Sequence, residues 1–359
     1  MRKVAIISTV GLKYDGITSV ILSYLESMDL KGLDIYIVAT NDCEQPIISR
    51  LTALGCHIVW LPSRKEHPII YFVKLSEFIR RKKIDVTHAH GNSATLAIEL
   101  MAAYFGGCKV RIAHSHNTKC NQIIADKMMR PIFSHLYTKA LACSSEAGKW
   151  LFKNNQFLVL TNGRNISRYQ YNEGIRSIVR KKLGVQSQIC IGHVGGFYEQ
   201  KNHKFLIDIF KEINKREKNV KFFLIGDGPL REQIEKISQG LDITFTGNID
   251  NVSDYLNAMD GMLLPSLFEG LPLVAVEWQI NGLPCILSDR ITRECSLTKT
   301  VAFMGLEDPA AWAKKILSMI TNNKRKEQAE EACRIIQDSR FNLEREAHTL
   351  RRIYMEGVE

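Results

Sequence analysis

Short apolar runs alternate with longer helix-like stretches along most of this 359-residue chain, and this alternation restricts its possible folds more than any other feature. In the first half, the expected strands are 4–8, 35–39, 57–60, 86–88, 110–113, 140–143 and 157–160. The expected helices, with apolar residues at helical spacing, are 17–28, 47–54, 70–81, 93–103 and one within 123–138. Strands that alternate with helices are typical of a parallel, doubly wound sheet, so the sequence predicts an α/β fold.

The alternation is interrupted once and then resumes. A polar stretch, 164–180, follows Thr161-Asn162-Gly163, and we expect it to link two domains. Beyond it, strands are expected at 189–194, 221–225, 243–245, 261–264 and 285–287, and helices at 205–215, 230–238, 253–259, 273–281 and in the charged tail 309–359. The chain length also fits two domains. The sequence therefore predicts two Rossmann-like domains with a cleft between them, and ligands that bind beyond the carboxyl ends of the strands.

The positive charge of the chain is concentrated in its first half. The net charge is +10, and residues 1–165 contain 21 Lys and Arg against 12 Asp and Glu. The densest basic run is 80–83, and an apolar segment, 123–141, is flanked by Lys119, Lys127, Arg130 and Lys139. Nucleic acid or an anionic membrane surface would explain such an excess, as would a solvated basic face with no partner. No nucleic-acid-binding motif accompanies the charge, so we expect no nucleic acid partner and favour the membrane.

Other features of the composition exclude several classes of protein. No run approaches the roughly 18–20 uncharged apolar residues of a membrane span, and the first apolar run is too short for a signal peptide. The nine cysteines are scattered and form no Cys-x-x-Cys pair. This pattern argues against a disulfide framework or a zinc ribbon and predicts a reduced, cytoplasmic protein.

Two His-x-His pairs come at the ends of expected strands in the first half. His88 and His90 form one pair, and His114 and His116 form the other. Residues two apart in a strand share a face, so each pair points to one side of the sheet. Three interpretations remain open: buried structural histidines, histidines that line the cleft, or a metal site. We expect no metal, because no Asp, Glu or Cys ligand cluster accompanies the pairs.

Two glutamates in the last third of the chain form the most suggestive site. Glu269 and Glu277 lie eight residues apart, and the residues before and between them predict a strand, a loop with the first glutamate and a helix with the second. Pro272 suits the first turn of that helix. The N–H groups of Gly270, Leu271 and Leu273 would then lie at a helix N-terminus, which is a natural anion site. The alternative is a solvated helix with two surface glutamates.

Two further loops at strand ends carry glycines and a lysine. In Val194-Gly195-Gly196-Phe197-Tyr198-Glu199-Gln200-Lys201-Asn202, the glycines allow close approach of the backbone and Lys201 offers a charge to a phosphate. The segment Ile225-Gly226-Asp227-Gly228-Pro229-Leu230 is a tight turn that opens a helix, and turn formation alone explains it equally well. The first strand-to-helix loop contains Gly16 but no Gly-x-Gly-x-x-Gly, so a simple dinucleotide fingerprint is absent.

Taken in order, these segments and Asn281-Gly282-Leu283-Pro284 resemble the retaining nucleotide-sugar glycosyltransferases of family four. The resemblance spans essentially the whole chain, and Arg111-Ile112-Ala113-His114-Ser115-His116-Asn117 is similar to members that build capsular or exopolysaccharide units. It implies a GT-B fold with an acceptor-binding domain at 1–168, a donor-binding domain at 174–341, and a C-terminal helix, about 342–359, that returns to the first domain. It also implies a metal-independent hexosyltransferase that uses a nucleotide-sugar, most commonly a UDP-sugar, as substrate and needs no cofactor. The acceptor would be a lipid-linked or other saccharide at the inner face of the cell membrane.

The resemblance also implies roles for individual residues. Glu269 would bond hydroxyls of the donor sugar, and Glu277 would bond the ribose. Lys201 would contact the diphosphate, which backbone amides near Leu271 and Leu273 would also hold. Gly16 would let the backbone approach the diphosphate from the other domain. His116, with His114 as the alternative, would lie near the anomeric carbon.

One position departs from the pattern. The family commonly has Arg where this chain has Gly196, so a charge expected on the leaving diphosphate is missing. Lys204 or Arg290 would be candidates to replace it. This departure keeps open the alternative of a sugar-nucleotide-binding protein without catalytic activity. Another enzyme of the same fold, such as a sugar-nucleotide epimerase or a glucan synthase, is a separate alternative.

Overall fold

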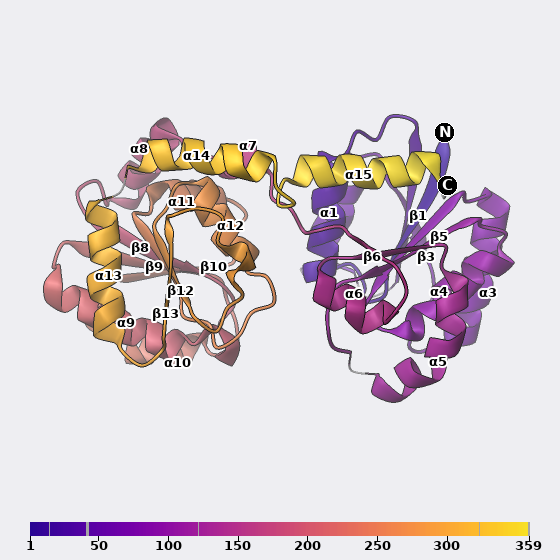
Figure 1. The fold of residues 1–359 in the computed structure, drawn as a ribbon, viewed down its shortest axis with the longest axis horizontal. Coiled ribbons are helices and arrows are strands. Elements are labelled where there is room, and N and C mark those ends of the chain that lie inside the picture. Colours follow the sequence, from indigo (N-terminus) through magenta and orange to yellow (C-terminus); the bar gives the residue numbers. More distant parts are fainter. Residues whose placement is uncertain (14, 41–42, 121, 323, 358–359) are drawn as a thin grey trace. The chain divides into compact units, whose positions relative to one another are not determined.

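The computed structural model describes residues 1–13, 15–40, 43–120, 122–322 and 324–357. It divides into two compact units (Figure 1). Unit 1 comprises Met1–Gly163 and Leu343–Glu359, and unit 2 comprises Arg164–Asn342. Each unit is a parallel sheet with helices on both faces, which confirms the α/β, Rossmann-like fold class.

The sheet of unit 1 has seven strands in the order β3-β2-β1-β4-β5-β6-β7, all parallel. The strands are β1 Arg2–Ser8, β2 Leu33–Ala39, β3 His57–Trp60, β4 Val86–Gly91, β5 Val110–Ser115, β6 Lys139–Ala142 and β7 Leu158–Val159. The chain order reverses between β1 and β4, and such a point is where doubly wound sheets bind ligands.

Helices cover both faces of this sheet because its strands are apolar on both sides. One face packs against α1 (Gly16–Ser27), α2 (Gln45–Ala53) and the C-terminal helix α15 (Leu343–Glu356). The other face packs against α3 (Pro68–Lys82), α4 (Ala97–Phe105), α5 (Ile123–Leu136) and α6 (Ser145–Phe152), and a 3₁₀ turn, η1 (Ala94–Leu96), precedes α4. Within β1, Ile6 packs toward α1 and Ile7 toward α3.

The C-terminal helix α15 is part of unit 1. Its buried apolar residues recur at helical spacing and pack beside those of α1: Leu343, Ala347, Leu350, Ile353 and Tyr354. The Glu346 carboxylate accepts a hydrogen bond of 3.1 Å from the Thr161 backbone N–H, which ties this helix to the end of the first stretch of unit 1. The helix therefore completes the core of the N-terminal sheet.

The sheet of unit 2 has six parallel strands in the order β10-β9-β8-β11-β12-β13. The strands are β8 Ile189–Val194, β9 Val220–Ile225, β10 Ile243–Gly247, β11 Gly261–Leu264, β12 Cys285–Ser288 and β13 Val301–Met304. One face packs against α9 (His203–Arg216), α10 (Arg231–Ile237) and α13 (Pro309–Thr321). The other packs against α8 (Glu173–Leu183), α11 (Val252–Ala258) and α12 (Leu273–Ile280), and α14 (Arg325–Gln337) covers α12.

The structure corrects three expectations about local structure. The stretch 164–180 is not a linker, because it forms α7 (Ile166–Tyr169) and most of α8 within unit 2. Arg176 and Arg180 in α8 both bond the Asp260 carboxylate, so the polar residues of this stretch hold α8 in place within unit 2. Pro272 is the N-cap of α12 and not part of its first turn. The edge strand β13, which is only half-buried, and helix α6 were not expected.

Candidate functional site

Lys201 and Glu269 meet at the carboxyl ends of two neighbouring strands of unit 2. Lys201 ends the short 3₁₀ turn η2 (Glu199–Lys201) that follows β8, and Glu269 lies in the loop between β11 and α12. Lys201 Nζ is 2.5 Å from Glu269 Oε1, and both side chains are largely buried. The structure thus brings together two residues that the sequence placed 68 positions apart. It leaves their roles as predictions.

Two polar neighbours hold the Glu269 carboxylate in place. Ser266 Oγ donates to Glu269 Oε1 at 2.9 Å, and Gln200 Nε2 donates to Glu269 Oε2 at 3.1 Å. The Leu267 backbone N–H also donates to the Gln200 carbonyl at 2.8 Å, which ties the two strand-end loops together. The carboxylate therefore keeps a fixed orientation, although further lone pairs remain that can accept hydrogen bonds from a ligand.

Glu277 lies one helical turn inside α12 and is paired with a residue that sequence reasoning missed. Arg164 Nε is 2.6 Å from Glu277 Oε1, and the glutamate side chain is 7% exposed. Burial and the nearby Glu277 carboxylate raise the pKa of Tyr169, whose ring comes from α7. Glu277 is thus a buried, charge-paired carboxylate, and not the surface glutamate of the alternative interpretation.

The N-terminus of α12 lies between the two glutamates in sequence. Its N-cap, Pro272, has extended backbone angles, and no side chain in the described part of the chain caps the helix. The first N–H groups of a helix have no partner within it, so Leu273 and the residue after it can donate to an anion. Gly270 and Leu271 precede the cap, and a Cβ at Gly270 would meet no atom within 4 Å. The predicted anion site is therefore geometrically open.

A glycine-lined turn brings β8 and β9 into close contact. Gly226 has a φ of +135°, and a Cβ there would lie 2.3 Å from the Gly195 carbonyl oxygen. Only glycine fits this approach. At Gly196, a Cβ would come within 2.7 Å of the ring of Tyr198, which is largely exposed. The Tyr198 ring thus covers the place where the resembled family has Arg. The two candidate replacements, Lys204 in α9 and Arg290 after β12, are both exposed.

In unit 1, Gly16 is the first residue of α1. The Asp15 carboxylate caps this helix and accepts hydrogen bonds from the N–H groups of Ile17 at 2.8 Å and Thr18 at 3.0 Å. A Cβ at Gly16 would meet no atom within 4 Å. The space at Gly16 is therefore open, whereas part of the helix N-terminus is already occupied by Asp15.

The four predicted histidines form one stack on the α1 and α15 side of the unit 1 sheet. His90 on β4 is in register with His114 on β5, and His116 follows the end of β5. His88 Nε2 lies 3.1 Å from His114 Nδ1, and His90 Nδ1 lies 2.9 Å from His116 Nε2. On the other side, His88 Nδ1 is 2.6 Å from the Tyr354 hydroxyl of α15. The histidines that the sequence placed at two strand ends are thus hydrogen-bonded to one another.

Burial keeps these imidazoles neutral. It lowers the pKa of His88, His90 and His114 well below the usual value, and neighbouring imidazoles lower it further. Burial lowers the pKa of His116 to about 3. His116 is half-buried, whereas the other three are fully buried. His116 is therefore the most exposed member of the stack, although its Nε2 is bonded to His90 and its Nδ1 is buried without a partner among the described residues.

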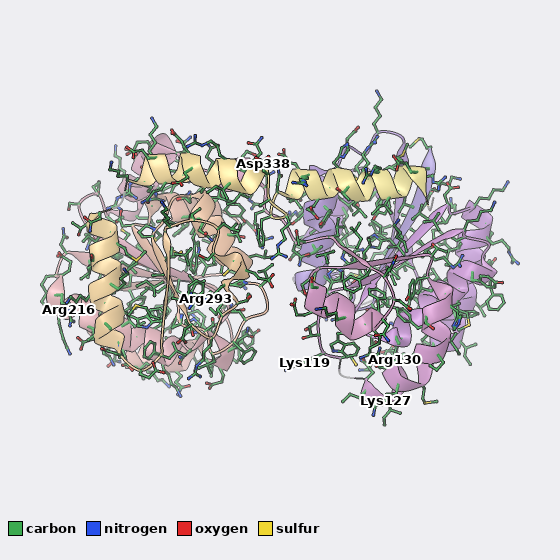
Figure 2. All side chains as sticks on the ribbon, viewed as in Figure 1. Lys119, Lys127, Arg130, Arg216, Arg293 and Asp338 are labelled. Atoms are coloured by element: carbon green, nitrogen blue, oxygen red, sulfur yellow. The ribbon has the colours of Figure 1, made fainter. Side chains whose placement is uncertain are left out.

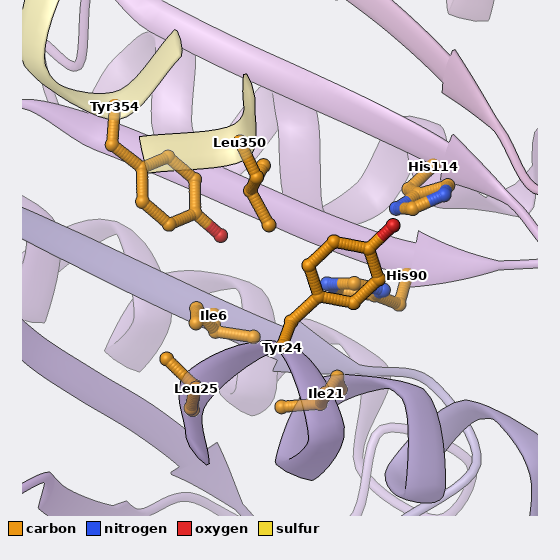
Figure 3. Close-up of a pocket in the computed structure, with 8 residues that line it drawn as sticks. All are labelled: Ile6, Ile21, Tyr24, Leu25, His90, His114, Leu350 and Tyr354. Atoms are coloured by element: carbon orange, nitrogen blue, oxygen red, sulfur yellow. The ribbon is translucent and has the colours of Figure 1, made fainter. Parts of the chain in front are cut away.

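A small cavity lies beside the stack (Figure 3). Its volume is about 10 Å³, and it is lined by aliphatic side chains together with His90, His114, Tyr24 and Tyr354. The Nε2 atoms of His90 and His114 are buried and have no hydrogen-bond partner among the described residues. A cavity of this size holds about one water molecule, which would satisfy such atoms.

Three of the histidines, His88, His90 and His114, present possible ligand atoms within 4.8 Å of one another. Nitrogens around a tetrahedral zinc ion lie closer together, roughly 3.3 Å apart for Zn–N bonds of about 2.0–2.1 Å. Both nitrogens of His88 are also used in hydrogen bonds. For these three residues the geometry favours a structural, hydrogen-bonded stack over a metal site.

Comparisons with known proteins agree with this architecture. Residues 188–322 match the family "Glycosyl transferases group 1". Over 326 residues the chain is 29% identical to the Bacillus subtilis glycosyltransferase EpsF, covering 85% of each chain. It is 26% identical over 243 residues to the Escherichia coli UDP-Gal:alpha-D-GlcNAc-diphosphoundecaprenol alpha-1,3-galactosyltransferase, covering 62% of each chain. The crystal structure of Anabaena HepE in complex with UDP superposes with a TM-score of 0.78 at 16% identity, over 99% of this chain and 100% of that one.

Proposed function

We propose that this chain, a glycosyltransferase whose residues 188–322 match the group 1 family, transfers a sugar from a UDP-sugar with retention of configuration. The Lys201–Glu269 pair beside the uncapped N-terminus of α12 is the observation that carries this proposal. Departure of a nucleoside diphosphate needs positive charge and N–H donors on its oxygens, and this corner of unit 2 offers both. The names of the Escherichia coli relative and of the HepE complex support UDP as the nucleotide.

In the proposed mechanism, unit 2 holds the donor. The Lys201 ammonium has three donors and uses one for Glu269, so the others can bond the diphosphate while the pair stays intact. The N–H groups near Leu271 and Leu273 bond the same phosphates. Glu269 accepts hydrogen bonds from the sugar hydroxyls with the lone pairs that Ser266 and Gln200 leave available. No metal ion takes part, because these groups supply the charge on the leaving group.

Glu277 binds the ribose in this account. Arg164 holds its Oε1, and the carboxylate has further lone pairs that can accept from the ribose hydroxyls. Burial of the pair keeps Glu277 in one orientation before the nucleotide arrives.

Unit 1 binds the acceptor in this proposal, and its Gly16 and half-buried His116 keep the roles that the resemblance implies, Gly16 for the diphosphate and His116 for the anomeric carbon. The acceptor is a lipid-linked saccharide, as the name of the Escherichia coli relative suggests. The product is a capsular or exopolysaccharide precursor, in line with the name of the Staphylococcus aureus capsular polysaccharide biosynthesis glycosyltransferase CapH, which is 25% identical over 327 residues. The protein then works as a peripheral protein at the cytoplasmic face of the membrane, to which the basic first half of the chain is attracted. No helix in the described ranges combines the length and the apolar character needed to cross a bilayer.

Gly196 favours a second candidate function, a protein that binds a sugar nucleotide without transferring the sugar. The charge expected there is missing, and Tyr198 covers the position. Loss of one such contact to a leaving group typically costs about 3–4 kcal/mol of transition-state stabilisation. Nucleotide binding without turnover would select this alternative.

The test is a transfer assay with purified protein, radiolabelled UDP-sugars and a polyprenyl-diphosphate saccharide, run with and without EDTA. We expect a labelled lipid product of α configuration from an α-linked donor, a rate that EDTA leaves unchanged, and a loss of at least about 100-fold for Glu269→Gln. Glu327→Gln, an exposed glutamate on α14, is the matched control and should retain full activity. If the donor binds but is not consumed with any lipid acceptor, the transfer reaction is contradicted, and the alternative of a sugar-nucleotide-binding protein remains.

A further inference from the structure

Helix α5 carries an apolar surface that the described residues of unit 1 leave exposed. Four large side chains on this helix are exposed: Ile123 (60%), Ile124 (78%), Met128 (73%) and Ile132 (48%). Ile124, Met128 and Ile132 are spaced by four residues, so they form one stripe along the helix, with Ile123 beside it. We call these four residues the α5 stripe. Single exposed apolar residues are common, but a contiguous set along one helix marks an interaction surface.

The opposite side of α5 shows that the stripe is not an unpacked core. Phe133 is fully buried against α6, and the helix packs against α4 and η1. Asp126 is buried and accepts a hydrogen bond of 2.8 Å from the Ala94 backbone N–H. Helix α5 therefore already has an inward face that fixes its rotation, and the stripe points away from the unit.

The charges on α5 are distributed in the same asymmetric way. Asp126 is the only carboxylate of the helix, and Arg130 pairs with it at 2.7 Å while its guanidinium lies over the Trp150 ring. Lys127 is exposed between the apolar residues, and Lys119 is exposed in the segment before the helix. Figure 2 shows Lys127 extending outward from α5. The outer face thus combines apolar side chains with cations and carries no carboxylate.

We infer that the α5 stripe inserts into the interface of an anionic lipid membrane, with Lys119 and Lys127 contacting lipid headgroups. A helix that lies in a membrane interface has this combination of an apolar face and flanking lysines. An anionic surface attracts the cations, and the absence of a carboxylate on this face removes the main source of repulsion. Protein interfaces more often use aromatic anchors, and the stripe has none. The inference deepens the proposed function, on which it rests for the membrane-bound acceptor, by naming the surface that meets the membrane.

The test is co-sedimentation of the full-length protein with vesicles, without donor or acceptor. We expect binding to mixed phosphatidylglycerol/phosphatidylcholine vesicles and at least about tenfold weaker binding to pure phosphatidylcholine. The double variant Ile124→Ser/Met128→Ser and the single variant Lys127→Glu should each weaken binding to the anionic vesicles by about tenfold or more. Neither change touches the buried face, so thermal unfolding should stay near that of the wild type.

Matched controls separate the α5 surface from general properties of the chain. Ile178→Ser removes an equally exposed isoleucine from α8 of unit 2, and Lys314→Glu makes the same charge change on α13. Both controls should bind vesicles like the wild type. Equal losses for Lys314→Glu and Lys127→Glu would mean that net charge alone drives binding and would overturn the inference. It would also be overturned if the wild type bound no vesicles and self-associated through a contact that Ile124→Ser/Met128→Ser abolished, because the stripe would then be a protein interface.

Failure here is distinguishable from failure of the proposed function. Transfer to a detergent-dispersed acceptor does not need a bilayer, so the α5 variants should keep their rate in that assay. Full transfer without vesicle binding would contradict only the membrane inference. Vesicle binding without any transfer or nucleotide binding would support the membrane inference and contradict the proposed function.

Discussion

Glu277 has a partner that lies 113 residues earlier in the chain, and this pair is the least predictable part of the candidate site. The sequence identified Lys201, Glu269 and Glu277 because each lies in a short segment with its own pattern. Arg164 lies in a polar stretch with no such pattern, and only the packing of α7 against α12 brings it to the glutamate. Gln200 lies in the quoted segment 194–202, but its contact with Glu269 depends on the approach of two loops, and Ser266 reaches Glu269 within its own loop. Local sequence patterns thus predicted the candidate site residues, but not the hydrogen-bond and ion-pair partners that position them.

The Arg164–Glu277 pair gives a prediction at this scale. Arg164→Met leaves a largely buried carboxylate without its cation, so we expect the free energy of unfolding to fall by about 2–3 kcal/mol. This is less than the roughly 3–5 kcal/mol for fully buried pairs, because the Arg164 side chain is 23% exposed. Urea denaturation measures the change. Adding Glu277→Gln to Arg164→Met should restore part of the loss, and a double variant as unstable as the sum of the single variants would show that the two residues do not interact.

At the scale of elements, the contact between the ends of β8 and β9 depends on one glycine. Gly226→Ala places a Cβ on the Gly195 carbonyl and strains a φ of +135°, so we expect a loss of at least about 2 kcal/mol in the free energy of unfolding. Gly16→Ala is the matched control, because its Cβ would enter open space at the first residue of a helix. It should fold like the wild type, as measured by thermal and urea unfolding. A stable Gly226→Ala would mean that the two strand ends are further apart than described.

The histidine stack on β4 and β5 predicts how stability depends on pH. Folding holds the pKa of these imidazoles below the value of about 6.5 in an unfolded chain. Below that pH the unfolded chain binds protons that the folded chain does not, so the free energy of unfolding falls as the pH falls. Each such histidine contributes up to about 1.4 kcal/mol per pH unit. The contribution of a histidine stops growing once the pH falls below its pKa in the folded chain. This pKa is about 3 for His116, and about 4 for His203, a buried histidine of unit 2 outside the stack.

Urea denaturation between pH 7.5 and about pH 5 checks this dependence. We expect a steady loss of stability below about pH 6.5, and the same loss in His135→Gln, which changes an exposed histidine on α5. Constant stability over this range would contradict the description of the stack as buried and neutral.

Most elements were predictable because buried parallel strands read as continuous apolar runs, as at 189–194 and 261–264. The helices within 164–180 were not predicted, because they contain few apolar residues. They are held instead by arginines that bond helix-end carbonyls and the Asp260 carboxylate. The edge strand β13 has only half-buried residues and gave a weak signal for the same reason.

At the scale of the whole molecule, two parallel sheets with reversed strand order follow from the repeated alternation of strands and helices. Each unit has its own core, so each presents its own strand-end loops as a binding surface. The central claim is that the loops of unit 2 bind the diphosphate and ribose of a nucleotide donor through Lys201, the start of α12 and Glu277.

Isothermal titration calorimetry with UDP, GDP and ADP tests this claim most directly, because it needs neither an acceptor nor turnover. We predict that UDP binds the wild type, that Glu277→Gln weakens binding by at least about tenfold through the lost ribose contact, and that Glu327→Gln binds normally. If no nucleotide binds the wild type, or if Glu277→Gln binds as tightly as the wild type, the nucleotide does not lie where this account puts it.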